Sequence, residues 1–167
     1  MVLSYVRIKL PREEAIQRFA IWLNWPLPNT LTLIDSSQAV DMACDSEGQW
    51  RGPAVFVHHK NDWTIFEDLT GFLTSRSPED WLKLAGVCEL VFAGYNDAIR
   101  YAELIAISGG EIIQDFFFDD SEPLLLRNNG ARVVDADSWI DIAPFVDEDD
   151  LAYSDTGFLW QLSEGVA

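Results

Sequence analysis

The chain of 167 residues carries 28 aspartates and glutamates against 11 lysines and arginines, so its formal charge is -17 at pH 7. Phosphate backbones and anionic lipid surfaces attract basic proteins, so this charge argues against direct binding to nucleic acid or to a membrane. Hydrophobic residues make up 49% of the chain, with 7 tryptophans and 10 phenylalanines, which is far more apolar material than an acidic disordered tail contains. We therefore expect one folded domain.

The N-terminus does not have the pattern of a targeting segment. The first 15 residues lack a basic region followed by an uninterrupted apolar stretch, and no window approaches the ~18 apolar residues of a membrane span. We therefore expect a cytoplasmic protein. Cys44 and Cys88 lie far apart, without a CxxC pair or a neighbouring histidine, and are expected to be reduced thiols.

The first strong pattern is an amphipathic helix that begins near Pro11. Proline is favoured in the first helical turn, and the two glutamates that follow suit the positive end of a helix. Apolar residues then recur at helical spacing until Pro26 ends the helix. Between residues 29 and 52 the pattern predicts a short strand at 31–34, followed by irregular chain.

A hairpin and a short helix follow. Residues 54–66 predict a β-hairpin, because two runs of β-branched and aromatic residues flank a polar turn at 60–62. The helix after it has Ser77 as the expected N-cap, Pro78 as its first residue and Gly86 as its stop. It is two turns long.

Residues 89–119 predict three further strands, at 89–93, at about 99–108 and at 111–119. The Gly109-Gly110 pair between the last two supplies the positive φ that a two-residue hairpin loop needs. Because most of the links are short, the sheet is expected to be antiparallel, such as a meander.

The C-terminal third predicts a short helix that begins near Ser138 and breaks near Pro144, and a last strand at 158–162. The fold class is therefore α+β, a single domain with an antiparallel sheet of about four to six strands and two or three helices packed on one face. Three segments make up that domain: an N-terminal helix and irregular segment (1–52), a sheet core with an inserted short helix (53–120), and an acidic C-terminal segment (121–167).

None of the common catalytic signatures occurs in the sequence. It lacks the GxSxG nucleophile elbow, the HExxH zinc motif, the P-loop and the dinucleotide motif GxGxxG. His58 and His59 are neighbours in a predicted strand, where their side chains point to opposite faces and cannot ligate one metal. The acidic run 147–150 lacks the glycine and the ligand spacing of an EF-hand. We therefore expect no catalytic, cofactor or metal site.

Glu103 is the acid with the most distinctive surroundings. In the predicted strand 99–108 it shares a face with Tyr101 and Ile105, so one acid lies on an otherwise apolar face. One interpretation is a hydrogen bond to a neighbouring strand or a position at the sheet edge. The other is a buried carboxyl with a raised pKa, which is typical of functional sites and would support a small enzyme that uses Glu103 with Tyr101 or Tyr95.

The negative charge is concentrated near the end of the chain. Residues 1–110 hold 14 acids and 9 bases, whereas residues 111–167 hold 14 acids and 2 bases. Clustered like charges repel one another, so they serve either solubility or a positively charged partner. In the second case they would speed encounter with a basic protein, and interleaved aromatic residues would anchor the complex. The candidate partner-binding residues are Asp115, Asp119, Asp120, Glu122, Asp135, Asp137, Asp141, Asp147, Glu148, Asp149, Asp150, Trp139 and Tyr153.

Three stretches of the sequence resemble a known class of proteins. They are DWTIFEDLTGFLTSRSPEDWLKLAG, ELVFAGYNDAIRYAELIAISGGEIIQDFFFDD and the closing DTGFLWQL. The order of their motifs is similar to that of the small acidic immunity proteins encoded beside polymorphic bacterial toxins, including inhibitors of Rhs-type and type VI secretion effectors. The likeness covers roughly residues 60–160 and rests on W-x-x-F-E-D-L, a capped helix with tryptophan, a glycine-turn hairpin and an acidic tail.

The resemblance implies a non-catalytic cytoplasmic inhibitor that binds one cognate toxin, often by covering its active site. Toxins that act on nucleic acids or nucleotides commonly have positive clefts, so the implied partner is a toxin with a basic surface, bound without a cofactor. The families have diverse folds, so the resemblance assigns no interface residue. Two alternatives remain: another acidic binding module, such as a nucleic-acid mimic that inhibits a nucleic-acid enzyme, and the small enzyme using Glu103.

Overall fold

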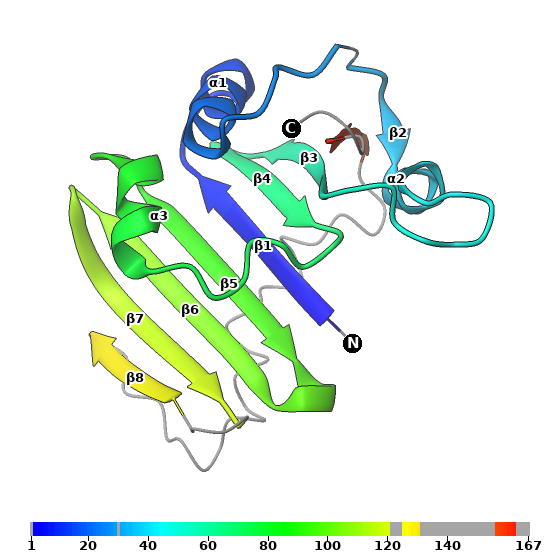
Figure 1. Cartoon of the computed structure of the whole chain (residues 1–167). Helices are drawn as coiled ribbons and strands as arrows, with labels where there is room; N and C mark the ends of the chain where they lie inside the picture. Colours follow the sequence, from blue (N-terminus) through cyan, green and yellow to red (C-terminus); the bar gives the residue numbers. More distant parts are fainter. Residues whose placement is uncertain (1, 30, 121–124, 131–155, 163–167) are drawn as a thin grey trace.

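A computed structural model describes residues 2–29, 31–120, 125–130 and 156–162 (Figure 1). The helices are α1 (Arg12–Leu23), α2 (Ser36–Ala43) and α3 (Pro78–Ala85), with a 3₁₀ turn at Asp97–Ile99. The strands are β1 (Val2–Ile8), β2 (Ile34–Asp35), β3 (Ala54–Lys60), β4 (Trp63–Asp68), β5 (Leu90–Asn96), β6 (Tyr101–Ser108), β7 (Glu111–Asp119), β8 (Leu125–Gly130) and β9 (Thr156–Gln161). In this part of the chain they form one sheet in the order β2-β9-β3-β4-β1-β5-β6-β7-β8, and every neighbouring pair is antiparallel.

The predicted count of four to six strands is wrong, although helices and an antiparallel sheet do combine as α+β. The sequence analysis misses β1, which lies in the middle of the sheet between β4 and β5. Ser4, Tyr5 and Val6 are all buried, so β1 has no alternation of apolar and polar residues to mark it as a strand. The meander is also interrupted, because β1 separates β4 from β5, so neighbouring strands follow one another in chain order only in the β3–β4 hairpin and from β5 to β8.

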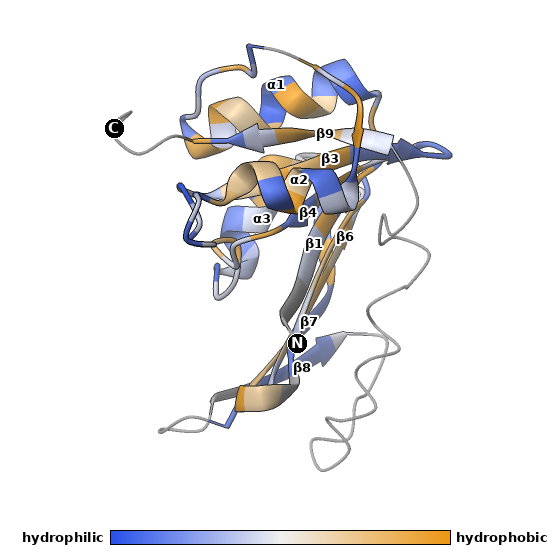
Figure 2. Ribbon diagram, turned by 90° about the vertical axis from the view of Figure 1, so that its right-hand side faces the viewer, coloured by the Kyte–Doolittle hydropathy of each residue, from blue (hydrophilic) through white to orange (hydrophobic). Residues whose placement is uncertain are grey.

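The prediction that the helices pack on one face of the sheet is wrong as well. Residues of α1 and α3 form one apolar cluster with Val55 and Val57 of β3, on what we name the helical face. Ala39 of α2 packs on Phe56, whose side chain points away from that face because side chains alternate along a strand. Figure 2 accordingly shows α1 and α2 on opposite sides of β3 and β9.

Local sequence explains where the helices begin and end. In α3, the Ser77 hydroxyl accepts a hydrogen bond from the Asp80 N–H (3.2 Å), and Gly86 follows with φ 56°, which confirms the predicted caps. The strand predicted at 31–34 is found as β2 at Ile34–Asp35, whereas the irregular chain predicted after it contains α2, because Asp35 and Gln38 form a reciprocal capping box. Among the described residues, no helix is long and apolar enough to cross a membrane.

The hairpin turns follow the sequence closely. Gly109 and Gly110 have φ of 59° and 79°, as the two-residue loop between β6 and β7 requires. Asn61 takes φ 55° in the turn between β3 and β4. The predicted strand at 158–162 is found as β9, which pairs with β3 and β2, whereas the helix predicted near Ser138 lies outside the described residues.

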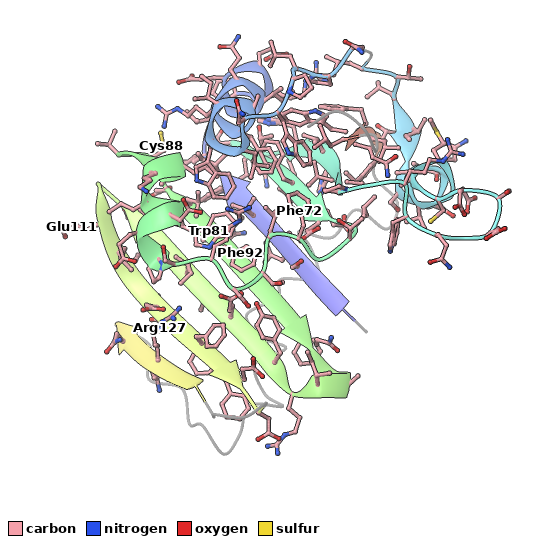
Figure 3. All side chains as sticks on the ribbon, in the orientation of Figure 1. Phe72, Trp81, Cys88, Phe92, Glu111 and Arg127 are labelled. Atoms are coloured by element: carbon pink, nitrogen blue, oxygen red, sulfur yellow. The ribbon has the colours of Figure 1, made fainter. Side chains whose placement is uncertain are left out.

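Aromatic pairs join the helices to the helical face. Phe19 of α1 stacks on Phe66 of β4 with ring centroids 4.2 Å apart, and Trp81 of α3 stacks on Phe92 of β5 at 4.4 Å (Figure 3). Such pairs add about 0.5–1.5 kcal/mol each beyond the burial of their area. The Trp22 indole N–H of α1 donates to the Asp80 carbonyl of α3 at 3.0 Å, which fixes the two helices to each other.

Candidate functional site

The structure describes Asp115, Asp119 and Asp120 among the predicted partner-binding acids, and it pairs Asp115 and Asp120 with arginines. Asp115 on β7 accepts hydrogen bonds from Arg127 Nε on β8 at 3.0 and 3.1 Å. Asp120 accepts from Arg100 Nη1 at 2.8 Å. Asp119 lies opposite Tyr101 in the β6–β7 register. The structure therefore places these acids at the β7 end of the sheet and neutralises part of their charge locally.

The other predicted partner-binding residues lie outside the part of the chain that the structure describes. They are Glu122, Asp135, Asp137, Trp139, Asp141, Asp147, Glu148, Asp149, Asp150 and Tyr153. Their role as a common acidic face stays a prediction from sequence.

The structure brings two buried carboxyls to the helical face, Asp68 at the end of β4 and Glu103 on β6. They belong to one row of residues that crosses the sheet, in which Ser4 pairs with Gly94 and Gly94 with Glu103. The residues 69–77 between β4 and α3, named here the 69–77 loop, pass over this row (Figure 1). Since neighbouring strands are ~4.8 Å apart and β1 and β5 intervene, the two acids are separated by roughly 14 Å.

Asp68 organises the beginning of the 69–77 loop. Its Oδ1 accepts hydrogen bonds from the N–H groups of Thr70 (3.1 Å) and Gly71 (2.8 Å). Its Oδ2 accepts from the N–H of Leu73 (2.8 Å) and from the Ser4 hydroxyl (3.2 Å). Burial raises the pKa of Asp68 and these four donors oppose the rise, so this carboxyl is a fully bonded anchor.

Glu103 holds the end of the same loop with a single bond. Its Oε2 accepts from the Ser75 N–H at 2.8 Å, while its Oε1 is buried without a hydrogen-bond partner. Burial raises the pKa of Glu103 to about 7, and nearby Asp115 adds to the rise, whereas the Ser75 N–H and Arg127 lower it. The structure thus confirms the interpretation as a buried carboxyl with a raised pKa, and its partner is a loop rather than a strand.

The surroundings of Glu103 contain two more polar groups on the helical face. The Tyr101 hydroxyl is buried without a partner and lies 3.5 Å from where a Cβ on Gly94 would be. Arg127 lies over the Phe117 ring at 5.0 Å, and its Nη2 is also buried and unpaired (Figure 3). A carboxyl with this pKa could exchange a proton near neutrality, but Glu103 has no exposed surface through which a substrate would reach it. The geometry supports loop anchoring.

Three hollows on the described surface lie elsewhere. Two flank Ile21 of α1, and the third lies at the start of α1 beside His59.

The His59 ring is hydrogen-bonded to Thr64 (3.1 Å), and the adjacent His58 is buried. Cys44 and Cys88 are free thiols, and the described residues contain no group of three or more metal-ligating side chains.

Asp68 is the site residue that sequence reasoning misses. The signal for it is the stretch Asp68-Leu69-Thr70-Gly71. In an Asx turn, the aspartate side chain accepts a hydrogen bond from the backbone N–H two residues further along the chain. Its link to Ser4 depends on β1 lying beside β4, which local sequence does not indicate.

The chain was compared with known proteins at three levels. No protein family, no curated sequence and no solved structure matches it.

Proposed function

We propose that the protein is an immunity protein that binds and neutralises a cognate toxin with a basic surface. The observation that carries the proposal is the uneven charge of the chain, with 14 acids and 2 bases after residue 110. A concentrated negative charge attracts a positive protein surface and accelerates its association. The resemblance of residues 60–160 to immunity proteins supports the same function, in which the chain has no catalytic role.

The proposal is tested first by rescue. Bacterial cells that produce the protein encoded next to this chain in its genome should survive when the chain is produced with it, and the two proteins should copurify in a fixed ratio. Loss of growth despite normal levels of the chain, together with no complex, contradicts the proposal.

The electrostatic part is tested by charge reversal. Replacing the four acids of the run 147–150 with lysine should slow association by at least ~10-fold at low salt and flatten its dependence on salt. The matched control reverses four exposed acids elsewhere, so that the net charge is the same: Glu14, Asp62, Glu79 and Glu111. Equal effects of the two sets would show that only net charge matters, and would remove the acidic C-terminal segment as a binding surface.

A further inference from the structure

The segment from Leu31 to Trp50, named here the β2–α2 edge, forms one border of the sheet. It contains β2, α2 and the turn that follows α2, and it projects at the right-hand side of the view in Figure 1. Sequence analysis expects mostly irregular chain here and assigns it no role in binding.

This edge exposes an unusual amount of apolar surface. The side chains of Leu33, Met42 and Trp50 are 61%, 55% and 41% exposed. Half of the large hydrophobic residues that are exposed in the described chain lie within this short segment: Leu31, Leu33, Val40, Met42 and Trp50. Single exposed apolar residues are ordinary, but a group of them along one border is typical of a surface that meets a partner.

The β2–α2 edge is rigidly attached to the sheet. α2 buries only the small residues Ala39 and Ala43, so the helix lies close to the sheet while its larger apolar side chains stay outside. Gln161 Nε2 of β9 donates to the Ala43 carbonyl at 2.9 Å, and the backbone of Cys44 pairs with that of Trp50. A surface that is already ordered loses little conformational entropy when it binds.

The charge of the edge is mostly negative, although Arg51 follows it directly and its Nε donates to the Cys44 carbonyl at 3.1 Å. Residues 31–50 contain no lysine or arginine, and their four acids are all exposed: Asp35, Asp41, Asp45 and Glu47. The backbone N–H groups of Gln49 and Glu47 bond to the Asp45 carboxylate and lower its pKa, so Asp45 is charged at neutral pH. Apolar side chains among charged ones match the arrangement of protein interfaces, which have an apolar centre and a polar rim.

We propose that the β2–α2 edge is a docking surface for the basic partner, with Trp50 and Met42 as its anchors. The proposal rests on the proposed function and adds where the toxin is bound. Four acids against the adjacent Arg51 leave the edge negative and complementary to a basic surface, whereas a second copy of this chain would bring two negative surfaces together. Apolar anchors surrounded by complementary charge supply affinity at the centre and attraction at the rim.

Ile21 of α1 provides a matched control. Its side chain is 82% exposed, more than any of the proposed anchors, so exposure alone would make it the better contact. Yet one of the hollows it borders is also lined by Arg18 and Lys83, which would repel a basic partner. Ile21→Ala therefore removes a similar exposed apolar side chain from positively charged surroundings, where a basic partner is not expected to bind.

The test measures the Kd of the purified product of the neighbouring gene for the full chain and its variants by calorimetry, and the association rate by stopped-flow fluorescence. The double variant Trp50→Ala/Met42→Ala should raise Kd by ~30-fold or more, and Asp41→Lys should slow association, while Ile21→Ala changes Kd less than ~2-fold. Thermal unfolding of each variant checks that the fold is kept.

The outcomes separate the two proposals. If the wild-type chain binds and the double variant binds equally well, the docking surface is refuted and the proposed function stands. An equal loss for Ile21→Ala would also refute it, because exposure and not this edge would then decide affinity. If the wild-type chain does not bind the product, the proposed function and the docking surface that rests on it both fail.

Discussion

Asp68 and Glu103 hold the two ends of the 69–77 loop on the same face of the sheet, and burial raises the pKa of both. Their hydrogen bonding is different. Both oxygens of Asp68 accept hydrogen bonds, four in all. Glu103 accepts one hydrogen bond, from the Ser75 N–H, and its Oε1 has no hydrogen-bond donor. The comparison shows that burial does not decide what a carboxyl contributes, because the number of donors decides whether its charge is compensated.

The largest expected effect is that of Asp68→Ala. It leaves three loop N–H groups and the Ser4 hydroxyl without their acceptor. Because Leu73 is buried, its N–H cannot form a replacement hydrogen bond with water. The free energy of unfolding in urea should fall by about 4 kcal/mol at pH 7. Asp68→Asn keeps one acceptor oxygen and should lose less. Losses under ~1 kcal/mol for both variants would contradict the anchoring role.

Glu103→Gln should have the next largest effect, and with the opposite sign. A folded pKa of about 7 lies above the ordinary value of 4.5, so ionisation of Glu103 opposes folding. This penalty is absent below pH 4.5 and complete above pH 7. The variant should therefore gain stability relative to wild type on the order of 3 kcal/mol between pH 4.5 and pH 8.

The measurement for Glu103→Gln is the difference in unfolding free energy between variant and wild type at several pH values. Taking the difference removes the contribution of the other acids of the chain. A difference that does not change with pH would mean that the pKa of Glu103 is the same in the folded and unfolded protein. The charge of Glu103 would then be compensated as well as that of Asp68.

Ser4→Ala should have a smaller effect than either. It removes one of the four donors to Asp68 and leaves the three backbone donors in place. A loss of about 1 kcal/mol in urea unfolding is expected for one such hydrogen bond. Repeating the change in the Asp68→Asn background should give a smaller loss if Ser4 acts through that carboxylate.

Tyr101→Phe should have the smallest effect. The Tyr101 hydroxyl is buried without a partner, so its removal breaks no hydrogen bond. Stability should change by less than about 0.5 kcal/mol, and a small gain is consistent with relief of the desolvated hydroxyl. A loss greater than 1 kcal/mol would show that the hydroxyl is bonded, and would bring the surroundings of Glu103 closer to those of Asp68.

Elements with a local chemical signal could be predicted from the sequence. The N-cap and stop of α3 depend on Ser77, Pro78 and Gly86, and the β6–β7 hairpin depends on Gly109 and Gly110. The capping box of α2 is equally local, in Asp35 and Gln38, but α2 buries only Ala39 and Ala43 and lacks large apolar residues at helical spacing.

Elements whose position depends on distant partners could not be predicted. β1 pairs with β4 and β5 from later parts of the chain, and both Tyr5 and Val6, which point to opposite faces, are buried, so its sequence lacks the alternation of a half-buried strand. The same holds for the candidate site. The sequence indicates Glu103 as an acid on an apolar face, but Ser75 reaches it only because the 69–77 loop folds back over the sheet.

The central place of β1 also constrains how the protein folds. Val6, near the start of the chain, lies opposite Phe66 on one side and Phe92 on the other, so neither partner strand exists when β1 leaves the ribosome. Both halves of the sheet must close large loops around it, and pairings so distant in sequence slow folding to milliseconds or seconds. Until Asp68 has been synthesised, β1 lacks both partner strands, and until Asn96 has been synthesised one edge of β1 stays unpaired and exposed to aggregation.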